Sequence, residues 1–118
     1  MSSRLPPRPF RIALFAACVA VVLWFSLAPP DSLPGIENFW DKAEHASAYM
    51  ALTLVGLALF GPSIPLVAGI WLLGVAVEFL QAAMPFDRMG DWRDAVANTV
   101  GVLAGLAVAW AARRLRAA

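Results

Sequence analysis

Residues 38–50 read Asn38-Phe39-Trp40-Asp41-Lys42-Ala43-Glu44-His45-Ala46-Ser47-Ala48-Tyr49-Met50 and stand at the start of a long apolar run. They include the only histidine, the only lysine and the only tyrosine of the chain. On a helix, Asp41, His45 and Tyr49 share one face because they are spaced four residues apart. A polar face on an apolar helix needs polar partners from other helices, so we expect the rest of the chain to fold around this stretch.

The composition excludes an ordinary soluble domain. Of the 118 residues, 61% are hydrophobic and only 14% are charged, whereas a soluble domain carries about 25% charged residues. A polytopic membrane protein is the better class. The single cysteine, Cys18, lies inside an apolar run and can form no internal disulfide.

The apolar residues divide into stretches of the length that crosses a membrane, about 20 residues. Segment 29–40 cannot be helical throughout because prolines and a glycine interrupt it. Segment 61–65 is so short that its flanking helices must be antiparallel neighbours. We predict a polar loop at 85–93, with Asp94 opening the last helix. The predicted spans are 10–28, 41–60, 64–84 and 95–112.

The positive charges predict the orientation. The net charge is only +1, but six of the nine basic residues lie at the two termini. They flank apolar helices directly, so the positive-inside rule explains them better than a nucleic-acid-binding arm does. We therefore predict an all-α membrane protein, a four-transmembrane-helix bundle with cytoplasmic N and C termini. The expected parts are a basic tail at 1–9, one transmembrane domain at 10–112 and a basic tail at 113–118; the terminal basic residues are Arg4, Arg8, Arg11, Arg113, Arg114 and Arg116.

A cleaved signal peptide is the alternative for the first span. Its basic start, apolar middle and Ser26-Leu27-Ala28 fit a signal sequence with a cleavage site. Pro29 directly after that site argues against cleavage, and four spans are needed to place both termini on one side.

Polar residues of three predicted helices fall at similar depths. With a helical rise of about 1.5 Å per residue, His45 lies roughly 6 Å and Tyr49 roughly 12 Å below the outer mouth. On the same scale Glu78 lies about 9 Å, Gln81 about 5 Å and Asn98 about 6 Å below it. On membrane-insertion scales, an ionisable side chain at such a depth raises the free energy by about a few kcal/mol. This cost is reduced when such side chains face one another or a water-filled pocket. We expect them to converge in one outer layer.

This layer is the candidate functional site. His45 and Glu78 form a candidate acid–base pair, and Arg88 or Lys42 would hold an anionic group. Gly101 and Gly105, four residues apart, predict close helix packing. The candidate ligand-binding residues are Asp41, Lys42, Tyr49, Gln81, Arg88, Asp94 and Asn98.

Each polar residue also has a purely structural interpretation. His45 would be a hydrogen-bonded histidine inside the bundle, and Glu78 would pair with Arg88. Asp94 would cap the last helix. Glu44 lies off the His45 face and is expected at the solvent or headgroup level. Taken together, the polar groups exceed what a small bundle needs for cohesion, which favours a ligand or reaction site.

A metal site is an alternative for some of these residues. Asp41, His45 and Glu78 make a conceivable ligand set, but one histidine without typical ligand spacing argues against it. No phosphate loop or dinucleotide fingerprint is present. We predict neither a metal nor a cofactor.

The spaced motifs resemble the VanZ-like family of small bacterial membrane proteins. They are Asp41-Lys42-x-x-His45-x-x-x-Tyr49, then Glu78-x-x-Gln81, then Arg88 followed by Asp94-x-x-x-Asn98-x-x-Gly101, with Ser26-Leu27-x-Pro29 upstream. The resemblance covers about residues 20–112. It implies a multi-pass protein of the bacterial cytoplasmic membrane, an envelope role and a link to resistance against teicoplanin-type glycopeptides. Family members often carry a small hydroxyl residue between the arginine and the aspartate, where this chain has Met89-Gly90-Asp91, so we expect no serine-dependent role.

Three functions compete. The first is a site, open to the outer leaflet, that binds or modifies an anionic envelope lipid or a lipid-linked glycan. The second is a non-enzymatic partner subunit or antibiotic-exclusion factor whose polar cluster is structural. A proton-coupled transporter is disfavoured because the cytoplasmic half has no second polar layer. Membrane lipids are the expected partners; nucleic acid is not, and the sequence identifies no protein partner.

Overall fold

The computed structural model describes residues 5–27, 38–83 and 92–117, with side chains from residue 43 onward in the second range. These residues form four helices and no strand: α1 (Arg8–Leu27), α2 (Asn38–Phe60), α3 (Ile64–Ala83) and α4 (Trp92–Ala117). Each helix is long and apolar enough to cross a membrane. The predicted all-α class with four spans is confirmed.

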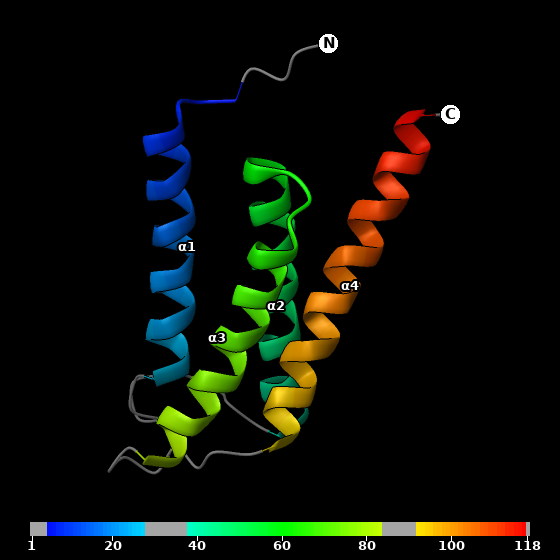
Figure 1. Cartoon of the computed structure of the whole chain (residues 1–118). Coiled ribbons are helices and arrows are strands. Elements are labelled where there is room, and N and C mark those ends of the chain that lie inside the picture. The colour runs from blue at the N-terminus through cyan, green and yellow to red at the C-terminus, as the bar shows by residue number, and fades with distance from the viewer. Residues whose placement is uncertain (1–4, 28–37, 84–91, 118) are drawn as a thin grey trace.

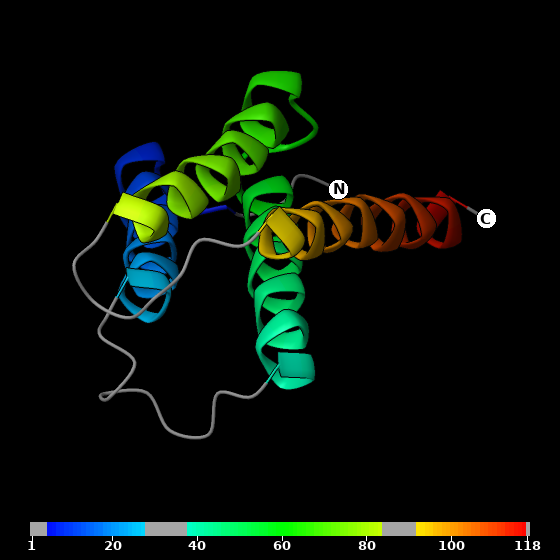
Figure 2. The same ribbon diagram turned by 90° about the horizontal axis from the view of Figure 1, so that it is seen from below.

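The helices run alternately up and down. Figure 1 shows the start of α1, the link between α2 and α3, and the end of α4 at one end of the molecule. α1 and α4 lie on opposite sides of α2 and α3, and α4 leans away from the other helices towards its C-terminal end (Figures 1 and 2). The contact between α2 and α4 is the most extensive of all the helix pairs.

Apolar side chains lie both in the interior of the bundle and on its outer surface. Tyr49, Leu52, Ile70 and Val102, from α2, α3 and α4, form a buried apolar cluster. Many other large apolar side chains, such as Phe79 at 74% exposure, remain uncovered. Apolar residues on the outside are expected where lipid surrounds a helix on all free sides.

The link between α2 and α3 is as tight as the sequence predicts. Gly61 ends α2 with a φ of 77°, a left-handed conformation that glycine adopts without strain. Its N–H donates to the carbonyl of Leu57 at 2.9 Å. The Ser63 hydroxyl then accepts from the backbone N–H of Leu66 at 3.3 Å, which caps the start of α3.

Several helix boundaries differ from the sequence prediction. α1 begins at Arg8, α2 begins at Asn38, and α4 runs from Trp92 to Ala117. The prediction of a loop as far as residue 93 was therefore wrong at its end; residues 84–91 lie outside the described part of the chain. Asp94 was also wrongly predicted as the helix cap, because it lies in the first turn of α4, where the helix dipole favours a carboxylate.

The last turns of α4 are basic. Arg114 and Arg116 lie in its final turn, where the dipole favours cations. The Arg114 guanidinium lies 5.1 Å from the centre of the Trp110 ring. Trp92 and Trp110, near the two ends of α4, are both exposed. The predicted basic tail thus begins as a continuation of the helix.

α4 approaches α2 most closely at two glycines. A Cβ atom on Gly101 would overlap the carbonyl oxygen of Ala46, and one on Gly105 would lie 2.8 Å from the Cβ of Thr53. Neither position therefore has room for a side chain unless the neighbouring atoms move. The missing side chains therefore allow the backbones of α2 and α4 to pack against each other, as in small-xxx-small contacts.

Gly101→Ala is expected to destabilise the fold by about 1–3 kcal/mol, the usual cost of overpacking. The matched control is Gly69→Ala on α3, where an added Cβ meets nothing within 4 Å. It should be neutral or stabilise the helix by up to about 1 kcal/mol. The free energy of unfolding in detergent measures both. Equal effects of the two substitutions would contradict the close packing of α4 on α2.

Candidate functional site

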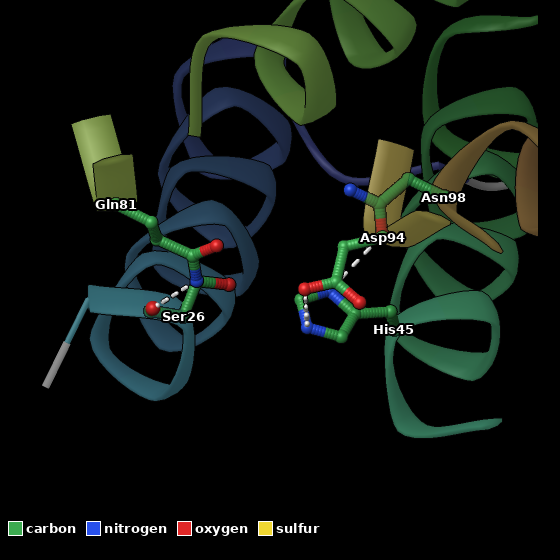
Figure 3. A network of polar contacts seen from close by, with 5 residues as sticks. All are labelled: Ser26, His45, Gln81, Asp94 and Asn98. Atoms are coloured by element: carbon green, nitrogen blue, oxygen red, sulfur yellow. Dashed lines mark hydrogen bonds and ion pairs between the residues drawn. The ribbon is translucent and has the colours of Figure 1, made fainter. Parts of the chain in front are cut away.

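Polar side chains of α2 and α4 meet at the end of the molecule opposite the α2–α3 link (Figure 3). His45 Nδ1 lies 3.2 Å from Asn98 Oδ1, and His45 Nε2 lies 3.7 Å from Asp94 Oδ2. His45, Asp94 and Asn98 are only 7%, 5% and 2% exposed. Because Asp94 and Asn98 are one turn apart, a single face of α4 presents both partners to the imidazole ring.

The two contacts restrict where protons reside. With the Asn98 amide oriented so that Oδ1 faces the ring, a hydrogen on His45 Nδ1 completes this bond. His45 Nε2 faces a carboxylate oxygen, and this contact is attractive only if a proton lies on Nε2 or on Asp94. In either arrangement the His45–Asp94 pair is neutral overall. A neutral pair is far less costly in a membrane than a lone charge.

A second polar contact joins α1 to α3. The Gln81 side-chain N–H₂ donates to the backbone carbonyl of Ser26. Ser26 lies in the last turn of α1, whose carbonyls have no partner within the helix. Gln81 was predicted as a ligand-binding residue, and this role stays a prediction; in the structure its amide nitrogen caps α1. The sequence signal for this contact was Pro29, because a proline ends a helix and leaves carbonyl groups before it that need a donor.

Tyr49, Glu78 and Asn98 come together where α2, α3 and α4 meet. Tyr49 is fully buried and Glu78 is 8% exposed. Glu78 lies one helical turn after Gly74 on α3. A Cβ atom on Gly74 would lie 3.2 Å from both Asn98 Nδ2 and Tyr49 Cε1. The layer therefore receives polar side chains from three helices, and Asn98, which contacts His45, also lies beside Gly74 of α3.

Other predicted site residues lie apart or cannot be described. Asp41 and Lys42 belong to α2, but their side chains lie outside the described part, as does the whole of Arg88. Glu44 is exposed, as its position off the His45 face predicts. Within the described residues, no group of three or more His, Cys, Asp or Glu side chains is placed to hold a metal ion.

Two further polar contacts between helices were not predicted. The Trp71 indole N–H donates to the Thr99 hydroxyl at 2.9 Å, joining α3 to α4. At the opposite end of the molecule from His45, Arg11 Nη1 donates to the backbone carbonyl of Leu59 at 2.7 Å, joining α1 to α2. A lone arginine inside an apolar run was a usable signal for the second contact. Nothing in the sequence marked Trp71 and Thr99 as partners.

Four membrane-crossing helices around a buried polar layer define a multi-pass helical membrane protein. No family model, curated protein or solved structure matches the chain. Its resemblance to the VanZ-like family therefore stays a prediction.

A double-mutant cycle measures the contact between His45 and Asn98. His45→Ala and Asn98→Ala should each destabilise the fold, and the double mutant should lose less than the sum, because each single change already breaks the hydrogen bond. The expected coupling is about 0.6–1.7 kcal/mol, the range for hydrogen bonds between membrane helices. Unfolding in detergent provides the four free energies. The control cycle pairs the exposed Glu44→Ala with Asn98→Ala and should be additive; coupling of the same size there would remove the evidence for a specific contact.

Proposed function

We propose that this chain is a VanZ-like protein of the bacterial cytoplasmic membrane. In this proposal its polar layer faces the outside and binds or modifies an anionic envelope lipid or a lipid-linked glycan. The supporting observation is His45, buried between Asp94 and Asn98 at one end of the molecule. Ionisable side chains inside a membrane protein are costly and mark functional sites more often than packing.

The charge distribution supports the orientation. Among the described residues, the end of the molecule that carries the start of α1 and the end of α4 also carries five arginines, which are Arg8, Arg11, Arg113, Arg114 and Arg116. By the positive-inside rule this end belongs in the cytoplasm. The polar layer lies at the other end and would then open towards the outer leaflet, where envelope lipids and glycans are found.

The side chains of the layer suggest how a ligand would be bound and which reaction it could undergo. His45 lies 3.7 Å from the Asp94 carboxylate, and Glu78 is a second buried carboxylate of the layer. Such groups suit general acid–base catalysis. Because Glu78 and Asp94 are acidic, an anionic headgroup would also need a cation, and Lys42 and Arg88 are the residues that we propose for this role. The resemblance further suggests a link to glycopeptide resistance.

A second candidate function is a non-enzymatic membrane partner or antibiotic-exclusion factor. One observation favours it: the polar contacts of the layer join helices to each other, α2 to α4 through His45 and α1 to α3 through Gln81. Groups engaged in this way stabilise a bundle without any ligand. The two functions differ in whether loss of these side chains affects ligand binding or only stability.

Native mass spectrometry of the protein purified from bacterial membranes tests the first proposal. The wild-type chain should retain a co-purifying lipid or lipid-linked glycan. Glu78→Gln and His45→Gln should each lower its occupancy about tenfold or more, because a hydrogen bond to a charged group is lost. Both substitutions nearly preserve side-chain volume, so the melting temperature should change little.

The matched control is Glu44→Gln, the same change at an exposed position beside His45. It should leave both occupancy and melting temperature unchanged. If the site substitutions lower the melting temperature but leave the bound lipid in place, the layer is structural and the second candidate function holds. Absence of any bound lipid in the wild-type protein would contradict the first.

Cysteine labelling in intact cells tests the orientation separately. In a Cys18→Ala background, cysteines at Ser32 and Met89 should react with a membrane-impermeant thiol reagent. A cysteine at Ser63, in the link between α2 and α3, should react only after the cells are opened. Reaction at Ser63 alone in intact cells would invert the orientation and place the polar layer on the cytoplasmic side.

A further inference from the structure

The end of the molecule that carries the α2–α3 link is positively charged. Its described residues include arginines at the start of α1 and at the end of α4. The acidic side chains of the described part are Glu44, Glu78 and Asp94, and all three lie in the halves of α2, α3 and α4 that are remote from this end. No carboxylate of the described part is therefore placed to neutralise these arginines.

Arg11 of α1 is held in place by three contacts. Its Nη1 donates to the carbonyl of Leu59 at 2.7 Å, and its Nε donates to the carbonyl of Pro6 at 3.0 Å. The guanidinium also lies 5.8 Å from the centre of the Phe60 ring. Carbonyl groups and an aromatic ring orient a cation but carry no net charge. The guanidinium is thus fixed in position, while its charge has no negative partner among the described residues.

The Arg11 guanidinium also has donors to spare. It has five N–H bonds, and the two carbonyl groups accept from two of them. A planar guanidinium can bind a phosphate group through two parallel N–H···O bonds. The exposed Arg8 lies three residues earlier on the same face of α1, so a second guanidinium can reach the same anion.

The depth of Arg11 fits a phospholipid better than a dissolved anion. α1 is long and apolar enough to cross a membrane, and Arg11 lies three residues from its start, about 4.5 Å along the axis. Lipid headgroups border the hydrocarbon at this level. One turn deeper, Phe15 packs edge-on against Phe60, and Leu14 is 50% exposed. An acyl chain attached to a phosphate at Arg11 would contact this apolar surface.

We propose that Arg11, together with Arg8, binds the phosphodiester group of one anionic phospholipid in the leaflet at this end of the molecule. A lipid such as phosphatidylglycerol supplies the negative charge that the described residues lack there. Phosphatidylcholine also has a phosphate group, but the two guanidinium groups would repel its quaternary ammonium group. The site lies at the opposite end of the molecule from the polar layer, so it does not depend on what that layer binds.

Native mass spectrometry tests the selectivity for charge. The purified protein in a non-ionic detergent receives phosphatidylglycerol and phosphatidylcholine in equal amounts. The wild type should bind one phosphatidylglycerol with a preference of about tenfold or more, because each arginine at a membrane surface favours an anionic lipid by about fivefold. Equal binding of the two lipids overturns the proposal. His45→Gln, in the polar layer, should leave the preference unchanged, which separates this site from the proposed function.

Arg11→Gln tests the location of the site. Its amide can still donate to the Leu59 carbonyl, but the charge is lost, so phosphatidylglycerol should no longer raise Tm as it does in the wild type. The matched control is Arg116→Gln, the same change at the same end of the molecule on α4, where the rise in Tm should persist. Equal losses in both variants would indicate a general attraction to arginines and overturn the assignment to Arg11.

Arg8→Gln provides a second variant that does not disturb the contacts of Arg11. Arg8 is exposed at the first position of α1, so its substitution should leave Tm without lipid unchanged. The preference for phosphatidylglycerol should fall about fivefold. For every variant, Tm is compared with and without lipid, so that a change in stability is not mistaken for a change in binding. An unchanged preference in Arg8→Gln would overturn the part of the proposal that concerns Arg8.

Discussion

The close packing of α4 against α2 is the constraint on which the polar layer depends. Gly101 and Gly105 have no side chains to hold the two backbones apart. Asp94 and Asn98 continue the same face of α4 towards the helix start, so the approach that the glycines permit also brings both side chains to His45. One face of a single helix thus supplies the packing contact and the polar contact together.

The C-terminal ends of two helices also depend on side chains from a neighbouring helix. In hydrocarbon no water is present to satisfy the last carbonyl groups of a helix, so side chains must do it. Gln81 of α3 donates to the last turn of α1, and Arg11 of α1 donates to the last turn of α2. Arg11 also lies over the Phe60 ring at 5.8 Å, which shields one face of the guanidinium from the lipid chains. These contacts connect neighbouring helices at opposite ends of the molecule.

The number of helices and the meeting of His45 with Asn98 could be predicted from the sequence for a simple reason. Span length is fixed by the membrane and rise per residue by the helix, so His45, Glu78 and Asn98 could be placed at similar depths without a structure. The rotation of each helix about its own axis could not be predicted in the same way. Helices that are apolar on most sides carry little information about which side faces a neighbour, so the contact between Trp71 and Thr99 could not be predicted. The contact of Gln81 with α1 could not be predicted either, because the position of α1 beside α3 depends on packing. Asp94 was misplaced by two residues because helix starts depend on local capping.

The length of α4 makes the thickness of the surrounding bilayer a physical variable for this protein. With 26 residues, α4 is about 39 Å long, while the hydrocarbon core is about 30 Å thick. The exposed Trp92 and Trp110 are separated by roughly 27 Å along the helix, close to the thickness that interfacial aromatic residues span. A thinner bilayer would therefore increase the tilt of α4. Because Asp94 and Asn98 lie on this helix and His45 lies on α2, lipid chain length is mechanically connected to the geometry around the single histidine.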